Sequence, residues 1–416
     1  MKIYKESELV NGLKIITSED KNSDIVTLAI WVRAGSRYEE QDELGYAHLL
    51  EHMLLKGTKS KPSFFDISLI TDRAGAYSNA STNAEIIKVV IQVAKEHWEK
   101  MFSLLADIII NLDLQEHILE NEKKVVIQES KRFYDNNERH LWLETVAKVF
   151  EGHPLSNHPL GTEECILSAT PARLYEYYRR YFRPNRMVLM VCGAVGQAEV
   201  VASAEKEFGA MDRGADALEH LVEPSGTQGS AFKLVPGLQT YLNFSFRGQV
   251  GSHKDSLILN LLANYLGYKH TSLLYQKLRH ALGLVYSISA YAVFFRDATL
   301  FYIATSSTTP KEVIPAVIDL LENLEGHLTP QLLEEYKEQY INILKRLFNN
   351  PIDEIESLGN YWNIYNRMIS LSEIENEVKN INYREVMEVK NRYLTKTNLS
   401  LIGLGGEDID LSQYLK

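Results

Sequence analysis

The chain has 416 residues, 45% hydrophobic and 24% charged, which is ordinary for a globular protein and long enough for roughly two to four domains. Its formal net charge of −11 argues against nucleic acid as the main partner, because phosphate binding requires a basic surface. The two cysteines, Cys165 and Cys192, exclude a disulfide scaffold and favour a cytoplasmic location. No apolar run approaches the ~20 residues of a membrane span, and the N-terminus lacks the apolar core of a signal peptide, so we expect no membrane partner and no export.

The elements predicted for the first half are strands and helices whose apolar residues follow periods of two and 3.6. The strands fit a largely antiparallel sheet, and the helices would cover one of its faces. In chain order we expect strands at 13–18 and 25–32, helices at 44–56 and 63–74, a strand at 86–94, helices at 98–110, 114–132 and 170–181, and a strand at 187–194.

The second half of the chain repeats the first half at a constant offset of 212 positions. The strand-like segment TLAIWVRAG at 27–35 falls on QTYLNFSFR at 239–247. In the same register AHLLEHMLL falls on NLLANYLG, IIKVVIQVA on a segment containing ATLFYIAT, and MFSLLADII on VIPAVIDLL. Chance alignment of amphipathic segments is the alternative, but one register holds through all four pairs without a gap.

These patterns predict an α+β fold of two homologous half-chain domains, each a largely antiparallel sheet covered by helices. We place an N-terminal domain at 1–215, a linker at 216–230 and a C-terminal domain at 231–416. The linker region is rich in glycine, serine and acidic residues and lacks clear periodicity.

The segment GYAHLLEHMLLKGT, at 45–58, places two histidines and an acid on a predicted helix that is otherwise apolar. His48 and His52 are four residues apart, so they share a face and can ligate one ion, and imidazole suits zinc. Glu51, one turn from His48, is placed to take a proton from metal-bound water. Asp42 and Glu43 before this helix would complement its N-terminal dipole. A third ligand must come from elsewhere, and five residues remain candidates by type: His97, His117, Glu122, Glu129 and His140.

The three polar groups could instead be hydrogen-bonded residues of a structural helix. The repeat bears on this alternative, because Glu51 falls on Ala263 and both histidines fall on asparagines, whereas Leu49 and Leu50 fall on leucines. The fold therefore does not require the three groups, and we predict a function confined to the first half.

With its neighbours, this segment resembles the inverted HxxEH zinc-binding motif of the pitrilysin/insulinase family. AGSRYEE precedes it, AYSNASTNAE and ENEKKVVIQE follow it, HPLGTEECI and YYRRYFRPNRMVLMVCG close the first half, and LRHALGLVYSISAY lies in the second half. The resemblance spans the whole chain and is greatest to short members, such as bacterial processing proteases and mitochondrial processing peptidase subunits. Two departures are Tyr46, where the family usually has a smaller aliphatic residue, and LGYKHTSLL, which replaces a glycine-rich turn and puts substrate choice in doubt.

The resemblance implies roles for the matching residues of the first half. His48 and His52 would bind zinc, and Glu129 would be the third ligand. Glu51 would be the general base, and Glu122 would orient a ligand histidine.

The resemblance also implies substrate contacts. Asn79 and Ala80 would lie on an edge strand that pairs with an extended peptide through backbone hydrogen bonds. Arg279 and Tyr286, from the second half, would contact the substrate and the developing oxyanion, for which a guanidinium and a hydroxyl are suitable donors.

The expected activity is zinc-dependent endopeptidase hydrolysis of peptides or unfolded precursor segments. Long family members have four domains, so the resemblance implies that a second chain closes a chamber around the site. A homodimer is the simplest arrangement, because one chain carries both the zinc motif and the Arg/Tyr pair, and a paralogous partner is the alternative. Two further hypotheses are a non-catalytic member acting as a scaffold or peptide-binding subunit, and a metal hydrolase acting on something other than peptides.

Overall fold

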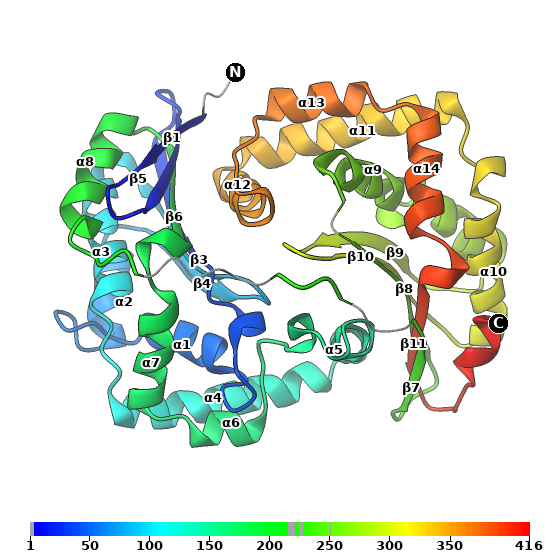
Figure 1. Cartoon of the computed structure of the whole chain (residues 1–416), viewed down its shortest axis with the longest axis horizontal. Helices are drawn as coiled ribbons and strands as arrows, with labels where there is room; N and C mark the ends of the chain where they lie inside the picture. Colours follow the sequence, from blue (N-terminus) through cyan, green and yellow to red (C-terminus); the bar gives the residue numbers. More distant parts are fainter. Residues whose placement is uncertain (1–3, 215–220, 225–227, 250) are drawn as a thin grey trace. The chain divides into compact units, whose positions relative to one another are not determined.

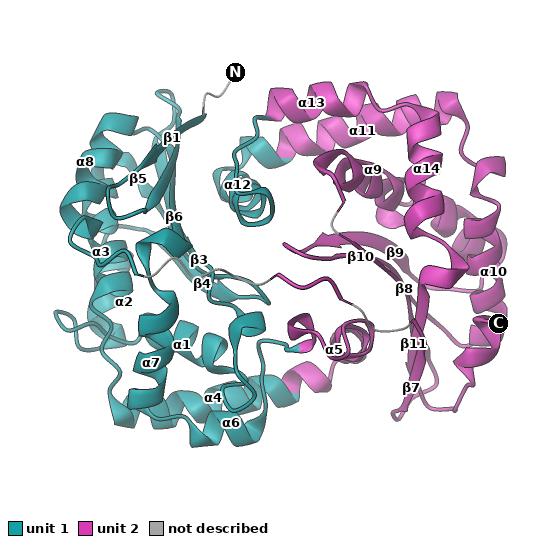
Figure 2. Cartoon of the chain, viewed as in Figure 1, with its two compact units in different colours: residues 1–131, 157–219, 347–370 teal, residues 132–156, 220–346, 371–416 magenta. Residues whose placement is uncertain are grey.

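The computed structural model describes residues 4–214, 221–224, 228–249 and 251–416 (Figure 1). The chain folds into two compact units, each assembled from three stretches of sequence (Figure 2). The first unit contains 1–131, 157–219 and 347–370, and the second contains 132–156, 220–346 and 371–416. The predicted linker, 216–230, lies partly outside the described residues, and the predicted domain limits stay a prediction.

The first unit is built on a six-stranded sheet. β2 and β6 are parallel, and every other neighbouring pair is antiparallel, as expected. In spatial order the strands are β1 (Tyr4–Glu8), β2 (Lys14–Glu19), β6 (Met187–Gly193), β3 (Ile25–Val32), β5 (Ile87–Ala94) and β4 (Tyr77–Thr82).

Helices cover both faces of this sheet, because the side chains of β3 point alternately to one face and to the other and are apolar on both. Leu28 and Ile30 belong to the main core together with residues of α1 and α3, because alternate side chains of a strand point to one face. Trp31 points to the other face and packs against Gly359 of α12. The helices of this unit are α1 (Tyr46–Leu54), α2 (Phe64–Arg73), α3 (Trp98–Ile110), α4 (Glu116–Tyr134, whose last turn enters the second unit), α6 (Glu163–Ser168), α7 (Pro171–Tyr181), α8 (Gln197–Phe208) and α12 (Pro351–Tyr365).

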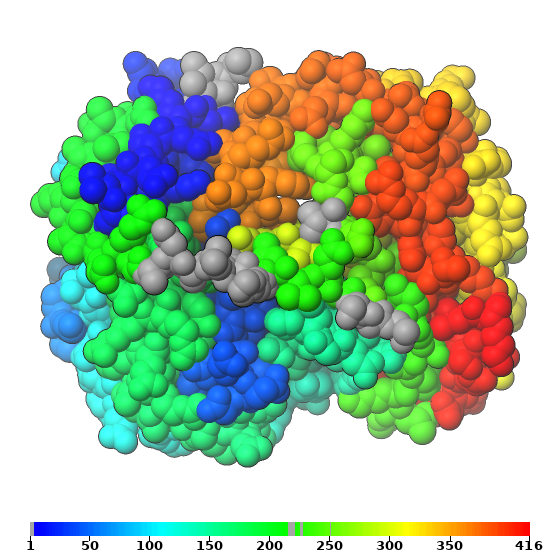
Figure 3. Space-filling view, in the orientation of Figure 1, coloured from blue at the N-terminus to red at the C-terminus, as the bar shows by residue number. Residues whose placement is uncertain are grey.

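The second unit is built on a five-stranded sheet with one parallel pair, β7 with β11. In spatial order its strands are β7 (Ser230–Leu234), β11 (Leu399–Gly405), β8 (Thr240–Gly248), β10 (Thr299–Ser307) and β9 (Ile288–Phe294). Its helices are α5 (Asn137–Val149), α9 (His253–Ala263), α10 (Pro310–Glu322), α11 (Pro330–Asn349, which ends in the first unit), α13 (Leu371–Lys379) and α14 (Tyr383–Tyr393). In the space-filling view, α13 and α14 form part of the surface of this unit (Figure 3).

The two sheets repeat each other, which confirms the α+β fold of two homologous halves. The order β2-β6-β3-β5-β4 of the first matches β7-β11-β8-β10-β9 of the second, including the position of the parallel pair. The bounds of α3 and α10, of α7 and α14, and of β6 and β11 differ by the same 212 positions at both ends. The repeat therefore extends well beyond the four segments in which the sequence reveals it.

One pair of equivalent helices is exchanged between the units, which the sequence did not predict. α5 follows the first-half helices in sequence but belongs to the second unit, where it packs on β8 and β11. α12, its repeat equivalent, belongs to the first unit and packs on β3 and β6. The compact units are thus not contiguous halves of the chain. Within the described ranges, no helix has both the length and the apolarity that crossing a membrane requires.

Candidate metal centre

α1 is fixed in the core by its apolar side, which leaves its polar side for the candidate site. Leu49, Leu50 and Met53 are fully buried in the core of the first unit. The helix starts after Gly45, whose positive φ of 97° favours glycine and whose Cβ, if present, would lie 2.6 Å from Ile166. The unusual Tyr46 is accommodated, since its buried ring meets the ring of Tyr177 edge-on.

His48, His52 and Glu129 bring three possible ligand atoms to one point. The two Nε2 atoms of the histidines lie 3.2 Å apart, and Oε2 of Glu129, on α4, lies 3.7 Å from that of His48 and 3.5 Å from that of His52. A tetrahedral zinc ion with ligands at about 2.0–2.1 Å holds those ligand atoms about 3.3 Å apart. The three residues therefore fit zinc in both chemistry and spacing, and no other such group of three occurs among the described residues.

Burial prepares two groups of this site for their expected roles. Burial and the neighbouring His52 lower the pKa of His48 to about 4, so its imidazole is neutral near pH 7, as metal binding requires. Glu51 lies beside the ligands, with Oε2 3.9 Å from Nε2 of His48, and Thr82 of β4 donates a hydrogen bond of 3.3 Å to it. Burial raises the pKa of Glu51, which strengthens it as a base.

Glu122 of α4 bridges His52 of α1 and Lys56, which lies in the turn after that helix. Its Oε2 lies 3.0 Å from Nδ1 of His52, and its Oε1 lies 2.8 Å from Nζ of Lys56. An N–H donated from Nδ1 to this carboxylate leaves the Nε2 lone pair free to face the ion, which is the usual partner arrangement of a metal-binding histidine. The geometry suits the expected orienting role, which stays a prediction. Of the other candidates, His140 pairs with Glu144 in the second unit, and His97 and His117 do not join the group.

The residues expected to contact substrate lie on different units. Asn79 and Ala80 are on β4, an edge strand of the first sheet that packs beside α1. Arg279 and Tyr286 belong to the second unit, where the guanidinium carbon of Arg279 lies 4.4 Å from the ring centre of Tyr286. The Tyr286 side chain is exposed. Arg279 and Tyr286 therefore form a contacting pair. The substrate roles of these two residues and of Asn79 and Ala80 stay predictions.

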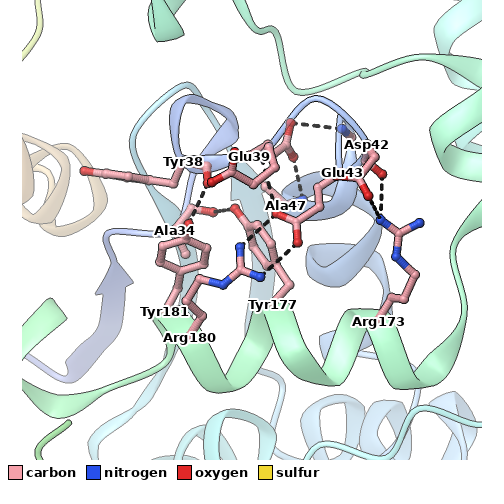
Figure 4. Close-up of polar contacts among 12 residues, drawn as sticks. Ala34, Tyr38, Glu39, Asp42, Glu43, Ala47, Arg173, Tyr177, Arg180 and Tyr181 are labelled. Atoms are coloured by element: carbon pink, nitrogen blue, oxygen red, sulfur yellow. Dashed lines mark hydrogen bonds and ion pairs between the residues drawn. The ribbon is translucent and has the colours of Figure 1, made fainter. Parts of the chain in front are cut away.

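The sequence did not predict that Glu39, a buried acid that precedes α1 in the chain, caps the start of this helix (Figure 4). Asp42 and Glu43 do not cap the helix; their side chains pair with Arg173 and Arg180. The capping bonds go instead to Glu39, which accepts from the backbone N–H of Gly45 at 2.9 Å and of Ala47 at 2.8 Å. The available signal was an acid in AGSRYEE, but a carboxylate reaching six residues ahead requires a loop that folds back.

Comparisons with known proteins identify the family of the chain. A family model described as insulinase, peptidase family M16, matches residues 14–163, and a model described as peptidase M16 inactive domain matches 168–340. An uncharacterized zinc protease of Bacillus subtilis is 28% identical, over 95% of this chain and 97% of its own. The mitochondrial-processing peptidase subunit beta of Caenorhabditis elegans is 25% identical, over 95% of this chain and 88% of its own.

The fold has a counterpart among solved structures. The crystal structure of a protease from Helicobacter pylori superposes with a TM-score of 0.88, covering 97% of this chain and 100% of that chain at 21% identity. This similarity covers both halves, and the two family models match consecutive regions of the sequence. The chain belongs to the pitrilysin/insulinase family, peptidase family M16.

Proposed function

We propose that this chain is a zinc-dependent endopeptidase that hydrolyses peptides or unfolded precursor segments. The convergence of His48, His52 and Glu129 on one point, with the Glu51 carboxylate beside them, carries the proposal. The naming of similar proteins as zinc proteases supports it.

The mechanism assigns each side chain a task. His48, His52 and Glu129 would hold zinc, which when bound polarises the scissile carbonyl and acidifies water. Glu51 takes the proton of the attacking water and passes it to the leaving amine, and its raised pKa lets it keep the proton between the two steps. Glu122 keeps the ring of His52 in the required tautomer and orientation.

Substrate binding combines backbone and side-chain contacts. Asn79 and Ala80 lie on β4, whose outer edge would pair with an extended peptide. This edge disfavours a substrate other than a peptide. Arg279 and Tyr286 supply hydrogen-bond donors of the type that stabilises an oxyanion.

Assembly with a second chain is part of the proposal. The chain supplies two units, and we propose that a second copy closes the chamber. A paralogous partner is the alternative, and a relative that is named as a peptidase subunit keeps it open. A cytoplasmic location also stays a prediction.

Replacing Glu51 by Gln tests the activity directly. Zinc content by elemental analysis should match that of the wild type, while cleavage of a mixed peptide library, followed by mass spectrometry, should fall by at least about 10²–10⁴-fold. His52→Ala should lose zinc and activity together. Full activity in Glu51→Gln would contradict the mechanism, and a zinc-loaded wild type that cleaves nothing would favour the non-catalytic alternative, which the "inactive domain" description of the second model keeps open.

A further inference from the structure

A basic surface of the second unit has no part in the mechanism above. No aspartate or glutamate occurs from 256 to 296, although acids outnumber lysines and arginines by 55 to 44 in the whole chain. This acid-free stretch includes LGYKHTSLL, the segment that replaces the family's glycine-rich turn. Five basic side chains lie in its middle, four exposed and one half-buried, and we call them the basic cluster: Lys269, His270, Lys277, Arg279 and His280.

The ring of Tyr275 lies at the centre of the basic cluster. This residue begins η6 (Tyr275–Ala281), a short helix. Its ring centre lies 4.8 Å from that of His270 and 5.3 Å from that of His280, and the guanidinium carbon of Arg279 lies 5.2 Å from it. The segment 269–274 and the helix η6 that follows it therefore bring basic side chains to one place.

No acid neutralises these side chains. In the described part of the chain, no member of the basic cluster forms an ion pair with an aspartate or glutamate. Other lysines of the same unit do form such pairs, Lys254 with Glu385 and Lys337 with Glu334. Positive charge that is not compensated within the protein attracts anions from outside.

The first unit shows how the fold neutralises a cation at the corresponding place. Lys61, in the loop after α1, has its Nζ 2.8 Å from Oδ2 of Asp107 on α3. Thr58 and Ser60 of the same loop donate hydrogen bonds of 2.6 and 2.8 Å to this carboxylate. The loop after α1 therefore has an acid of its own.

The second unit keeps the acid of this arrangement but not its contacts with the loop. Asp319 of α10 corresponds to Asp107, and Asn323 donates to its Oδ1 at 2.8 Å, just as Asn111 donates to that of Asp107. Among the described residues, Asp319 makes no bond to the segment 269–274. The uncompensated charge is therefore specific to the second unit. The residues at the positions of Thr58, Ser60 and Lys61 are His270, Ser272 and Leu273.

The backbone that carries Lys269 and His270 is held in place. Nε2 of Gln276 donates a hydrogen bond of 2.5 Å to the carbonyl of His270, and the hydroxyl of Tyr336 donates one of 3.2 Å to the carbonyl of Thr271. A ligand would therefore have to order the side chains alone, which lowers the entropic cost of binding.

We propose that the basic cluster binds acidic side chains, aspartate or glutamate, of a peptide substrate. The ammonium and guanidinium groups would pair with the carboxylates, which meet no competing acid in the cluster. A nucleic acid is disfavoured, because the net charge of −11 would repel a long polyphosphate beyond the cluster. The assignment to a substrate rests on the proposed function, whereas the preference for an anion rests on the cluster alone.

Direct binding tests the preference for an anion without catalysis. The zinc-loaded full chain carrying Glu51→Gln, in which the probe should survive, is titrated by calorimetry at about 50 mM salt. The acidic probe is acetyl-GEGEGEG-amide, and acetyl-GQGQGQG-amide is the uncharged probe. The acidic probe should bind at least about fivefold more tightly, and about 500 mM salt should remove most of the difference.

Single lysine variants in the same background locate the binding surface. Lys269→Gln and Lys277→Gln should each weaken binding of the acidic probe by about two- to fivefold and leave the uncharged probe unchanged. Lys277→Glu reverses the charge and should weaken the acidic probe further. Lys311→Gln, which removes an exposed lysine of the same unit outside the cluster, is the matched control and should change neither probe.

The outcomes separate the basic cluster from the proposed function. Equal affinity for the two probes, or unchanged affinity in both Lys269→Gln and Lys277→Gln, would overturn the proposal. Tighter binding of tripolyphosphate than of the acidic probe would overturn the assignment to a peptide. Peptide cleavage by the wild type without any preference for the acidic probe would refute the cluster alone, whereas binding of that probe by a chain whose wild type cleaves no peptide would refute the proposed function alone.

Discussion

The carboxylate of Glu43 receives two hydrogen bonds of 3.0 Å from the guanidinium of Arg180, and the same ion pair recurs in the second unit. Asp255 and Arg392 occupy the equivalent positions and lie 2.6 Å apart. The repeated pair ties the start of one helix to the end of another in each half. What the two halves share in this way belongs to the fold, and what only the first half has is available for function.

Asp42 and Arg173 show the same relation with the charges reversed. Their ion pair of 2.6 Å corresponds to Lys254 and Glu385, which lie 2.5 Å apart. The position retains an ion pair although the sign of each partner has changed. Glu39, in contrast, corresponds to Gly251. The buried acid that caps α1 therefore occurs only in the half that carries the metal ligands.

Removing the charge of Glu43 should cost more stability than removing that of Asp42. Glu43 is buried and holds Arg180 through two bonds, so Glu43→Gln should lower the free energy of unfolding by about 1–3 kcal/mol. Asp42 is 76% exposed, so Asp42→Asn should cost less than about 1 kcal/mol. Urea denaturation of both variants shows which loses more free energy of unfolding. Equal losses would contradict the claim that the fold requires the ion pair between Glu43 and Arg180.

Glu39 should make stability depend on pH. Burial raises the pKa of this carboxyl from about 4.5 to about 8 in the folded chain. Between these values the folded state keeps a proton that the unfolded chain has lost, so this group lowers the free energy of unfolding as pH rises from about 4.5 to about 8. Glu39→Gln should flatten that part of the stability profile in denaturation experiments at several pH values. The exposed neighbour Glu40, changed to Gln, should leave the profile as it is.

Glu122 should contribute to zinc affinity although it is not proposed as a ligand. Glu122→Ala removes the acceptor of the His52 ring N–H, so zinc binding should weaken by about 10–100-fold in competition with a chelator. Lys56→Met leaves that acceptor in place and should weaken zinc binding much less. Equal zinc affinities in the wild type and Glu122→Ala would show that Glu122 does not contribute to zinc binding through His52.

A side chain at position 359 should disturb the docking of α12. A Cβ on Gly359 would lie 2.5 Å from the buried indole of Trp31, so Gly359→Ala should lower the free energy of unfolding by about 1–3 kcal/mol. Gly326→Ala is the matched control, because a Cβ there meets no atom within 4 Å. Thermal or urea unfolding separates the two, and a neutral Gly359→Ala would show that the helix can shift without cost.

Mixing two inactive variants tests the shared site. Arg279→Ala and Glu51→Gln should each be inactive in a homodimer that combines residues of both chains. If dimers re-form at random, about half are mixed and each mixed dimer has one intact site, so activity should return to about a quarter of the wild-type value. No recovery in a sample whose mixed dimers are verified by mass spectrometry would place all the catalytic groups in one chain.

Local spacing made part of this molecule predictable. The histidine pair follows from the period of an α-helix, and the repeat could be read because strand and helix patterns survive when identity does not. The third ligand could not be chosen from spacing, because Glu122 and Glu129 lie two turns apart on one face of α4. Both contact the histidines, and the placement of α4 decides that Glu129 lies beside the two Nε2 atoms whereas Glu122 lies beside Nδ1 of His52.

Packing between distant segments decided the features that were missed. Nothing in the sequence of α5 distinguishes its own half's sheet from the other, since an amphipathic helix after a loop can cover either. Glu39 caps α1 because the loop from 40 to 45 returns the chain to it, and the loop in turn is held by Arg173 and Arg180. Such closure depends on residues more than a hundred positions away.

The exchange of α5 and α12 bears on how a protein of this kind could arise. A single half, cut at the predicted linker, would carry a helix that has no sheet of its own to cover and a sheet that lacks a helix on one face. Two copies of such a half could satisfy both needs by trading helices, as domain-swapped dimers do. Joining two copies end to end would then make the trade internal, which frees one copy to lose the metal ligands while the other keeps them.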